Sequence, residues 1–280
     1  MDVKRRVGCE PYFTPPDLAA RCVALVDDLC GLGSFDLVVE PSAGKGAFLR
    51  LLPESTRVGV DIEPRVPDVE RADFLGWRPV SGSGRILTVG NPPFGQRAAL
   101  AMSFLHHACS FSDTVAFILP RSFNKYTFQD RVHPLFHLTG SFDCDDFHGE
   151  AGNRLTVKAV FQVWERRDRH RARVVMPDAH PDFVMRHRHL SRLAPGELER
   201  LRTEFAFTVP QVGVDFRPRD VATVTRGSHW FINPLVHGVR ERFERLDFGF
   251  LDGMNTAHRS LSRRDIVTAY TALTGDVRNP

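Results

Sequence analysis

A four-residue segment with the composition of an amine-binding site follows an apolar run at residues 86–89. The segment is Asn91-Pro92-Pro93-Phe94, and the run before it has the character of a buried strand. The asparagine side-chain oxygen and a backbone carbonyl could each accept one N–H bond of a planar primary amine, while the aromatic ring stacks on its plane. The exocyclic amine of adenine presents this chemical problem. Asn-Pro alone is also an ordinary turn signal, so the neighbouring segments decide between the two.

A turn rich in small residues follows another apolar run. Gly44 and Gly46 allow the backbone to turn tightly there and to approach a ligand, and Ser42 belongs to the same turn. The third glycine of a dinucleotide fingerprint is missing, which disfavours NAD, and the spacing of a phosphate-binding loop is absent. Glu40, just before the turn, could hold a cationic amino group.

Two further acidic residues stand where a nucleoside could be bound. Asp61 lies at the end of a predicted strand, the position from which a ribose hydroxyl pair is bound in doubly wound sheets. Asp73 could accept a bond from an adenine amino group while Phe74 packs on the base. Together with the glycine turn, these residues fit a nucleoside that carries an amino-acid tail, which is S-adenosylmethionine.

The order of these segments resembles the class I S-adenosylmethionine-dependent methyltransferases. More narrowly, it is similar to the gamma group of N6-adenine DNA methyltransferases, whose catalytic motif is NPP[YF]. The resemblance covers about residues 10–165. It rests on five segments in the family's order, at residues 12–16, 40–48, 59–64, 72–74 and 91–94.

The resemblance implies roles for the residues on the cofactor side. Thr14 and Glu40 would hold the methionine end of S-adenosylmethionine, with Ser42, Gly44 and Gly46 in the turn beside it. Asp61 would bind the ribose, and Asp73 with Phe74 would receive the adenine of the cofactor.

The resemblance also implies roles on the target side. Asn91 and the Pro92 carbonyl would bind the target amine, and Phe94 would stack on the target base. The family often places a second aromatic residue before its last core strand, and Phe147 matches it best. Phe123 is the other candidate for that second ring.

The alternation of apolar runs and amphipathic segments predicts an α/β fold. We expect a doubly wound, mainly parallel, Rossmann-like methyltransferase sheet at residues 1–165 and a small mixed C-terminal module at 166–280, possibly for nucleic-acid recognition. His133, His137 and His148 would lie in a loop after the last central strand. The predicted helices lie at 16–30, 98–111, 196–205, 234–246 and 262–272, with another opening at 44–49. The predicted strands lie at 35–39, 58–62, 86–89, 115–119 and 157–163.

The arginines of the second part fit a nucleic-acid partner, either DNA or RNA, although the codon usage of a GC-rich genome explains them equally well. The net charge is +3, and residues 165–280 hold 20 arginines, no lysine and 15 acidic residues. Arginine binds phosphate through two parallel bonds. The basic run at 166–173 could form an electrostatic footprint, although a solvated linker explains it equally well.

Composition limits the other function classes. No apolar run reaches the roughly 20 residues of a bilayer span, and no secretory signal is evident, so no membrane is predicted. The five cysteines show no metal-ligand spacing, which predicts reduced thiols, no metal and a cytoplasmic protein, or one associated with a nucleus or nucleoid.

The sequence leaves four functions open, and methylation of adenine in DNA is favoured. Only about 115 residues follow the first part, which is small for a sequence-reading domain, so adenine in ribosomal, transfer, messenger or cap-adjacent RNA is the second possibility. A protein partner could aid target recognition. Methylation of a protein glutamine amide is the third possibility, and a non-catalytic methyltransferase subunit is the fourth.

Overall fold

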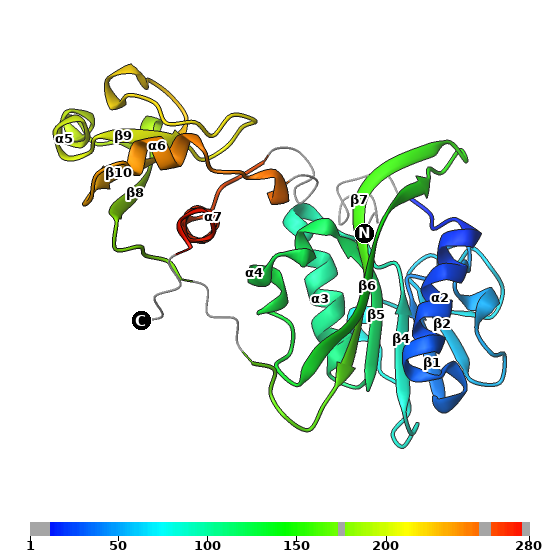
Figure 1. Cartoon of the computed structure of the whole chain (residues 1–280). Coiled ribbons are helices and arrows are strands. Elements are labelled where there is room, and N and C mark those ends of the chain that lie inside the picture. The colour runs from blue at the N-terminus through cyan, green and yellow to red at the C-terminus, as the bar shows by residue number, and fades with distance from the viewer. Residues whose placement is uncertain (1–11, 173–176, 252–258, 276–280) are drawn as a thin grey trace. The chain divides into compact units, whose positions relative to one another are not determined.

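The structure, a computed structural model, describes residues 12–172, 177–251 and 259–275. The chain separates into two compact units that divide between Arg173 and Val174. Each unit has its own sheet (Figure 1). Each unit also has its own hydrophobic core.

The first unit is built on a seven-stranded sheet with the order β3-β2-β1-β4-β5-β7-β6. Strands β1 to β5 are parallel, whereas β7 runs antiparallel to both of its neighbours, β5 and β6. The strands are β1 Leu37–Pro41, β2 Arg57–Asp61, β3 Val69–Arg71, β4 Ile86–Gly90, β5 Thr114–Pro120, β6 Phe136–His148 and β7 Arg154–Arg166. The prediction of a doubly wound, mainly parallel sheet is confirmed.

Helices cover both faces of this sheet, and the buried strand β5 shows the division. Val115, Phe117 and Leu119 belong to the same core cluster as α3 (Ala99–Cys109). The residues between them, Ala116 and Ile118, pack in the cluster of α2 (Pro16–Cys30). Alternate side chains of a strand point to opposite faces, so the continuous apolar run reflects burial on both sides.

The second unit contains a three-stranded antiparallel sheet in the order β8-β10-β9. Its strands are β8 Phe183–His189, β9 Phe207–Pro210 and β10 Ser228–Pro234, and its helices are α5 Glu197–Glu204, α6 Val239–Glu244 and α7 Arg263–Thr274. A capping box begins α7, because the Ser262 and Asp265 side chains each accept a bond from the other's backbone N–H.

Several predicted elements differ from the observed ones. The helix expected at 44–49 is a series of turns followed by the short 3-10 segment Leu49–Leu51. Within the helix expected at 234–246, only α6 is α-helical. Pro234, the first residue of the expected range, is the last residue of β10. The short helix α4 (Tyr126–Gln129) and the strands β3, β6, β8, β9 and β10 were not predicted. His137 and His148 lie in β6 rather than in a loop.

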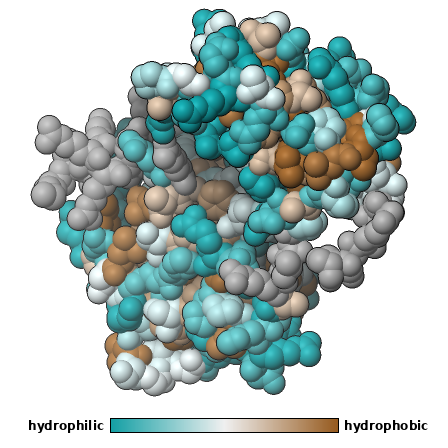
Figure 2. All heavy atoms as spheres, turned by 90° about the vertical axis from the view of Figure 1, so that its left-hand side faces the viewer, coloured by the Kyte–Doolittle hydropathy of each residue, from teal (hydrophilic) through white to brown (hydrophobic). Residues whose placement is uncertain are grey.

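In the part of the chain that the structure describes, no helix combines the length and apolarity that crossing a bilayer requires. The face of the molecule in Figure 2 is mainly hydrophilic, with hydrophobic side chains gathered in separate places.

Candidate active site

The carboxyl ends of β1 and β4 meet where the strand order of the first sheet reverses. The chain runs outward from β1 to β3 and then returns to β4 beside β1. A Cβ atom on Gly90, the last residue of β4, would lie 3.4 Å from the Pro41 carbonyl oxygen, so the two strand ends approach closely. Open α/β sheets bind ligands at this switch point. The glycine turn follows one strand end and Asn91 follows the other.

The glycine turn is held against the end of β2 by Asp61. Ser42, Gly44 and Gly46 have positive φ angles of 56°, 53° and 72°, which explains the small residues there. The Gly44 N–H donates to Asp61 Oδ2 at 2.8 Å, and the Glu63 N–H donates to Oδ1 at 2.7 Å. A carboxylate has about four acceptor positions, so Asp61 can still receive a hydroxyl donor.

Glu40 holds the turn from within. The backbone N–H of Leu49 donates to one carboxyl oxygen at 2.6 Å and that of Phe48 to the other at 3.4 Å. The side chain is buried, and burial raises the pKa of Glu40 to about 8, with the Asp61 charge adding to this. The carboxyl is directed to the backbone of the turn, and its binding of a cationic amino group stays a prediction.

The amide of Asn91 is oriented by Thr14. Its Nδ2 donates to Thr14 Oγ1 at 3.2 Å, which brings the Thr-Pro segment to the end of β4. Asn91 Oδ1 is buried and accepts no hydrogen bond from any residue that the structure describes. A buried acceptor without a donor costs about 1–3 kcal/mol, so this oxygen is energetically prepared for a ligand N–H group. Thr14 was expected at the methionine end of a cofactor, but its observed contact is with Asn91.

The backbone after Asn91 is constrained on both sides of Phe94. Two prolines precede it, and Gly95 follows with a φ of +66°. The Phe94 carbonyl accepts a bond from the Ala101 N–H at 3.3 Å, which ties the segment to the first turn of α3. The half-buried ring of Phe94 is thus held beside Asn91 by local chain geometry.

A ring that the sequence analysis missed connects Phe94 with Phe147. The Tyr12 ring makes edge contacts with both, with centroids 5.2 Å apart in each pair. Phe147 has no exposed surface in this arrangement, and its stacking on a target base stays a prediction. Tyr12, in contrast, contacts Phe94 directly. Its position two residues before Thr14 in the Tyr-Phe-Thr-Pro segment was the available signal.

Phe13 lies over the glycine turn. Its backbone forms two hydrogen bonds with His148 in β6, at 2.7 and 2.9 Å. A Cβ atom on Gly44 would lie 3.6 Å from the ring, and the Lys45 ammonium nitrogen lies 4.2 Å from the ring centroid. This part of the N-terminal segment therefore packs on the turn, a role that the sequence analysis did not assign.

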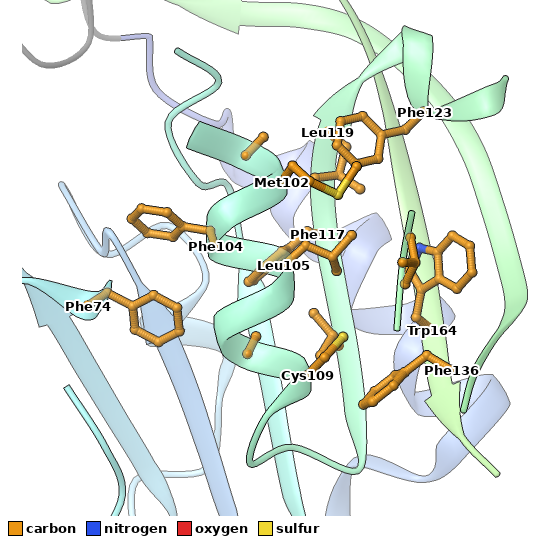
Figure 3. Packing of buried hydrophobic residues seen from close by; sticks show 14 of the residues in the cluster. Phe74, Met102, Phe104, Leu105, Cys109, Phe117, Leu119, Phe123, Phe136 and Trp164 are labelled. Carbon is orange, nitrogen blue, oxygen red and sulfur yellow. The ribbon is translucent and has the colours of Figure 1, made fainter. Parts of the chain in front are cut away.

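Of the two residues expected to receive the adenine of a cofactor, one is buried and the other is exposed. Phe74 is buried, with its ring centroid 5.1 Å from that of Phe104 and 4.9 Å from that of His107, and it points toward α3 (Figure 3). In this arrangement the ring belongs to the core, and its packing on a base stays a prediction. Asp73 is exposed and accepts a bond from the Leu75 N–H at 3.1 Å.

Phe123 also belongs to the core. It follows β5 and has no exposed surface, and its ring lies beside Leu119 and Met102 (Figure 3). The Phe128 ring is 5.0 Å away, and the Gln162 side chain donates to the Phe123 carbonyl at 3.2 Å. A contact of Phe123 with substrate stays a prediction.

Comparisons with known proteins add likenesses to solved structures. No protein-family model matches the chain, and no curated protein matches it. It is similar to a candidate RNA methyltransferase from Pyrococcus horikoshii, at 20% identity over 61% of this chain and 90% of that chain, with a TM-score of 0.46. It is similar to magnesium protoporphyrin IX methyltransferase from Synechocystis with bound S-adenosylmethionine, at 11% identity over 58% and 89% of the two chains, with a TM-score of 0.38.

A third similar structure is the M protein of the type I restriction enzyme EcoKI. The identity is 15%, the match covers 55% of this chain and 44% of that chain, and the TM-score is 0.40. Identities at this level describe a likeness of fold and not of activity.

Proposed function

We propose that this chain transfers a methyl group from S-adenosylmethionine to the N6 amino group of adenine in nucleic acid, with DNA as the first substrate to test. The observation that carries the proposal is the buried Oδ1 of Asn91, which has no donor among the described residues. Thr14 orients it, and it follows the strand at the switch point beside the Phe94 ring.

The residues at the strand ends fit the cofactor. S-adenosylmethionine, when bound, supplies an electrophilic methyl group on a sulfonium. The turn with Ser42, Gly44 and Gly46 presents backbone without bulky side chains, and Asp61 keeps acceptor positions for a ribose hydroxyl. Asp73 is exposed after β3, where it can accept from an amino group.

The target side acts by orientation. The adenine amine is a weak nucleophile because its lone pair is delocalised into the ring. Asn91 Oδ1 and the Pro92 carbonyl would each accept one N–H, which localises the lone pair on the nitrogen. Methyl transfer would form a bond from this nitrogen to carbon, leave the electrons of the carbon–sulfur bond on sulfur, and release one amine proton to solvent. Holding the two reacting atoms in line provides much of the rate gain.

A base within a duplex cannot reach such a pocket. The target would have to be unstacked or already single-stranded, at a cost of a few kcal/mol. Stacking on Phe94 would offset part of that cost. This requirement applies equally to DNA and RNA, so the substrate has to be identified by experiment.

Transfer of labelled methyl tests the proposal. The chain is incubated with labelled S-adenosylmethionine and with duplex DNA, single-stranded DNA, total RNA or protein, and the products are analysed for N6-methyladenine. We expect the label in adenine, its loss in Asn91→Ala, and its retention in Asn233→Ala, which removes an asparagine from β10 of the second unit. Label only in protein would overturn the proposal in favour of a glutamine acceptor.

Calorimetry separates an enzyme from a non-catalytic subunit. We expect the wild type and Asn91→Ala to bind S-adenosylmethionine with similar affinity, because Asn91 is assigned to the target amine. A chain that binds no S-adenosylmethionine would contradict the proposed activity.

A further inference from the structure

The second unit has a depression at one end of its three-stranded sheet. Its volume is about 770 Å³. It is lined by His189 at the end of β8, by Ser228 and His229 at the start of β10, and by the loop that follows β9. Binding sites for small molecules have volumes of roughly 300–1,000 Å³, so a single nucleotide is of suitable size.

His229, which lines this depression, carries a hydrogen-bond acceptor without a partner in the described part of the chain. The residue is 5% exposed, and its Nε2 lies 3.0 Å from the Arg226 carbonyl oxygen. A carbonyl can only accept, so Nε2 carries the proton and Nδ1 has a lone pair. Nδ1 is buried and has no hydrogen-bond partner among the residues that the structure describes. An N–H or O–H group of a ligand that reaches it would remove a penalty of about 1–3 kcal/mol.

The neutral form of His229 is favoured by its surroundings. Burial lowers its pKa, and the positive charge of Arg219 and the nearby His187 lower it further, against the effect of the bond to the Arg226 carbonyl. His187 itself bonds Gln211 and Ser228, at 3.0 and 3.1 Å. The imidazole of His229 is therefore an acceptor and not a cation at neutral pH.

Two arginines at the depression can bind phosphate. Arg219 and Arg226 are exposed, and the Arg219 guanidinium lies 3.7 Å from the Asp215 carboxylate. The Arg226 side chain has no acidic partner in the described part of the second unit. Guanidinium groups match the geometry of phosphate oxygens.

Apolar surface lies next to these polar groups. Val214 is 86% exposed and Val212 46% exposed, and both line the depression. Exposed apolar side chains at a concave polar site often mark a contact surface, and the flat face of a base fits such a surface.

We propose that this depression binds one nucleotide of the nucleic-acid substrate, other than the target adenine. The phosphate would lie at Arg226 and Arg219, the base against Val214, and a ribose hydroxyl or base amino group would donate to His229 Nδ1. The inference rests on the proposed function, from which it takes nucleic acid as the ligand class.

Binding of labelled oligonucleotides to the full chain tests the inference. Fluorescence anisotropy is measured with a short single-stranded RNA and the matching DNA, over a range of salt concentrations. Arg226→Gln should weaken binding several-fold and reduce the slope of log affinity against log salt by about 0.7, the value for one phosphate contact on a single strand. Arg245→Gln removes the same charge from a position outside the depression, and should leave the slope unchanged.

His229→Phe tests the acceptor and identifies the donor. A preference for RNA that disappears in this variant would identify a ribose hydroxyl, and an equal loss for RNA and DNA would identify a base amino group. Unchanged affinity for both RNA and DNA in the variant would contradict the role of His229. Thermal melting monitors folding, and the exposed Arg226→Gln carries the test if His229→Phe melts early.

The outcomes separate this inference from the proposed function. Wild-type affinity and salt slope in Arg226→Gln would overturn the nucleotide site even if methyl transfer to adenine is found. Binding that depends on Arg226, in a chain that methylates no nucleic acid, would support the site and contradict the proposed function.

Discussion

The side-chain amide of Asn91 donates to the hydroxyl of Thr14 at 3.2 Å, although 77 positions separate the two residues. An amide has one donor end and one acceptor end. Because Nδ2 is bonded to Thr14, Oδ1 is left as the acceptor for another donor. This contact makes Thr14 a positioning residue for the proposed amine site.

We predict that Thr14→Val lowers the kcat of methyl transfer by about two- to tenfold, which corresponds to the roughly 0.5–1.5 kcal/mol of one hydrogen bond. Valine has a similar shape but offers no acceptor, so the amide can rotate. The affinity for S-adenosylmethionine, measured by calorimetry, should change little. Thr14→Ser restores the hydroxyl and should restore kcat. A loss in donor affinity with kcat unchanged would instead support the cofactor role expected from the sequence.

Periodicity predicted the elements that are buried on a defined face. The helices α2 and α3 and the central strands β1, β2, β4 and β5 have apolar residues at helical spacing or in short continuous runs. Strand β6 was missed because it carries polar and charged residues at most of its positions. The helix expected after Gly44 is absent. The turn continues to Phe48 and Leu49, whose backbone N–H groups donate to the Glu40 carboxyl.

The sequence predicted the location only of those site residues that directly follow a strand. Asn91 and the glycine turn follow strands that the sequence identifies, so their neighbourhood was foreseeable. The directions of three phenylalanine side chains were not, because Phe74, Phe123 and Phe147 all point into cores formed by distant segments. The contact between Tyr12 and Phe94 likewise depends on how the N-terminal segment returns to the sheet.

We predict that Glu40→Gln makes the thermal stability of the chain less dependent on pH. The pKa of Glu40 rises from 4.5 to about 8 on folding, so the folded state favours the protonated carboxyl. Its contribution to the free energy of unfolding is fully present below pH 4.5 and is lost as the pH rises through about 8. Glutamine stays neutral and keeps an acceptor for the Leu49 N–H. Parallel melting profiles of the two proteins would contradict this account.

The same variant separates two roles for Glu40. If Glu40 holds the turn, Glu40→Gln should bind S-adenosylmethionine within a few-fold of the wild-type affinity, because the turn is preserved. A large loss of affinity at constant stability would mean that the carboxylate contacts the cationic amino group after all. Calorimetry at a pH where the wild-type carboxyl is ionised makes the comparison direct.

We predict that Gly95→Ala destabilises the chain more than Gly82→Ala. Both glycines have positive φ angles, +66° and +85°, so both alanines carry the left-handed penalty of about 1–2 kcal/mol. Only at Gly95 would the new Cβ lie 2.7 Å from Leu100 Cβ, whereas nothing lies within 4 Å at Gly82. The difference should be about 1–3 kcal/mol, typical of overpacking, and is measured by urea unfolding. Equal losses of stability in the two variants would mean that α3 shifts at Leu100 without cost.

We predict that a substitution at Phe94 mainly changes substrate binding, whereas one at Phe123 mainly changes stability. Phe94→Leu should change stability little, because the ring is only partly buried, but should raise the KM for nucleic acid, because base–aromatic stacking contributes about 1–3 kcal/mol. Phe123→Leu should lower the free energy of unfolding by about 1 kcal/mol, because it removes packing from a fully buried site. Its KM should remain that of the wild type once activity is normalised to folded protein. Urea unfolding and steady-state kinetics on both variants test the pair, and a raised KM in Phe123→Leu would return that ring to the substrate site.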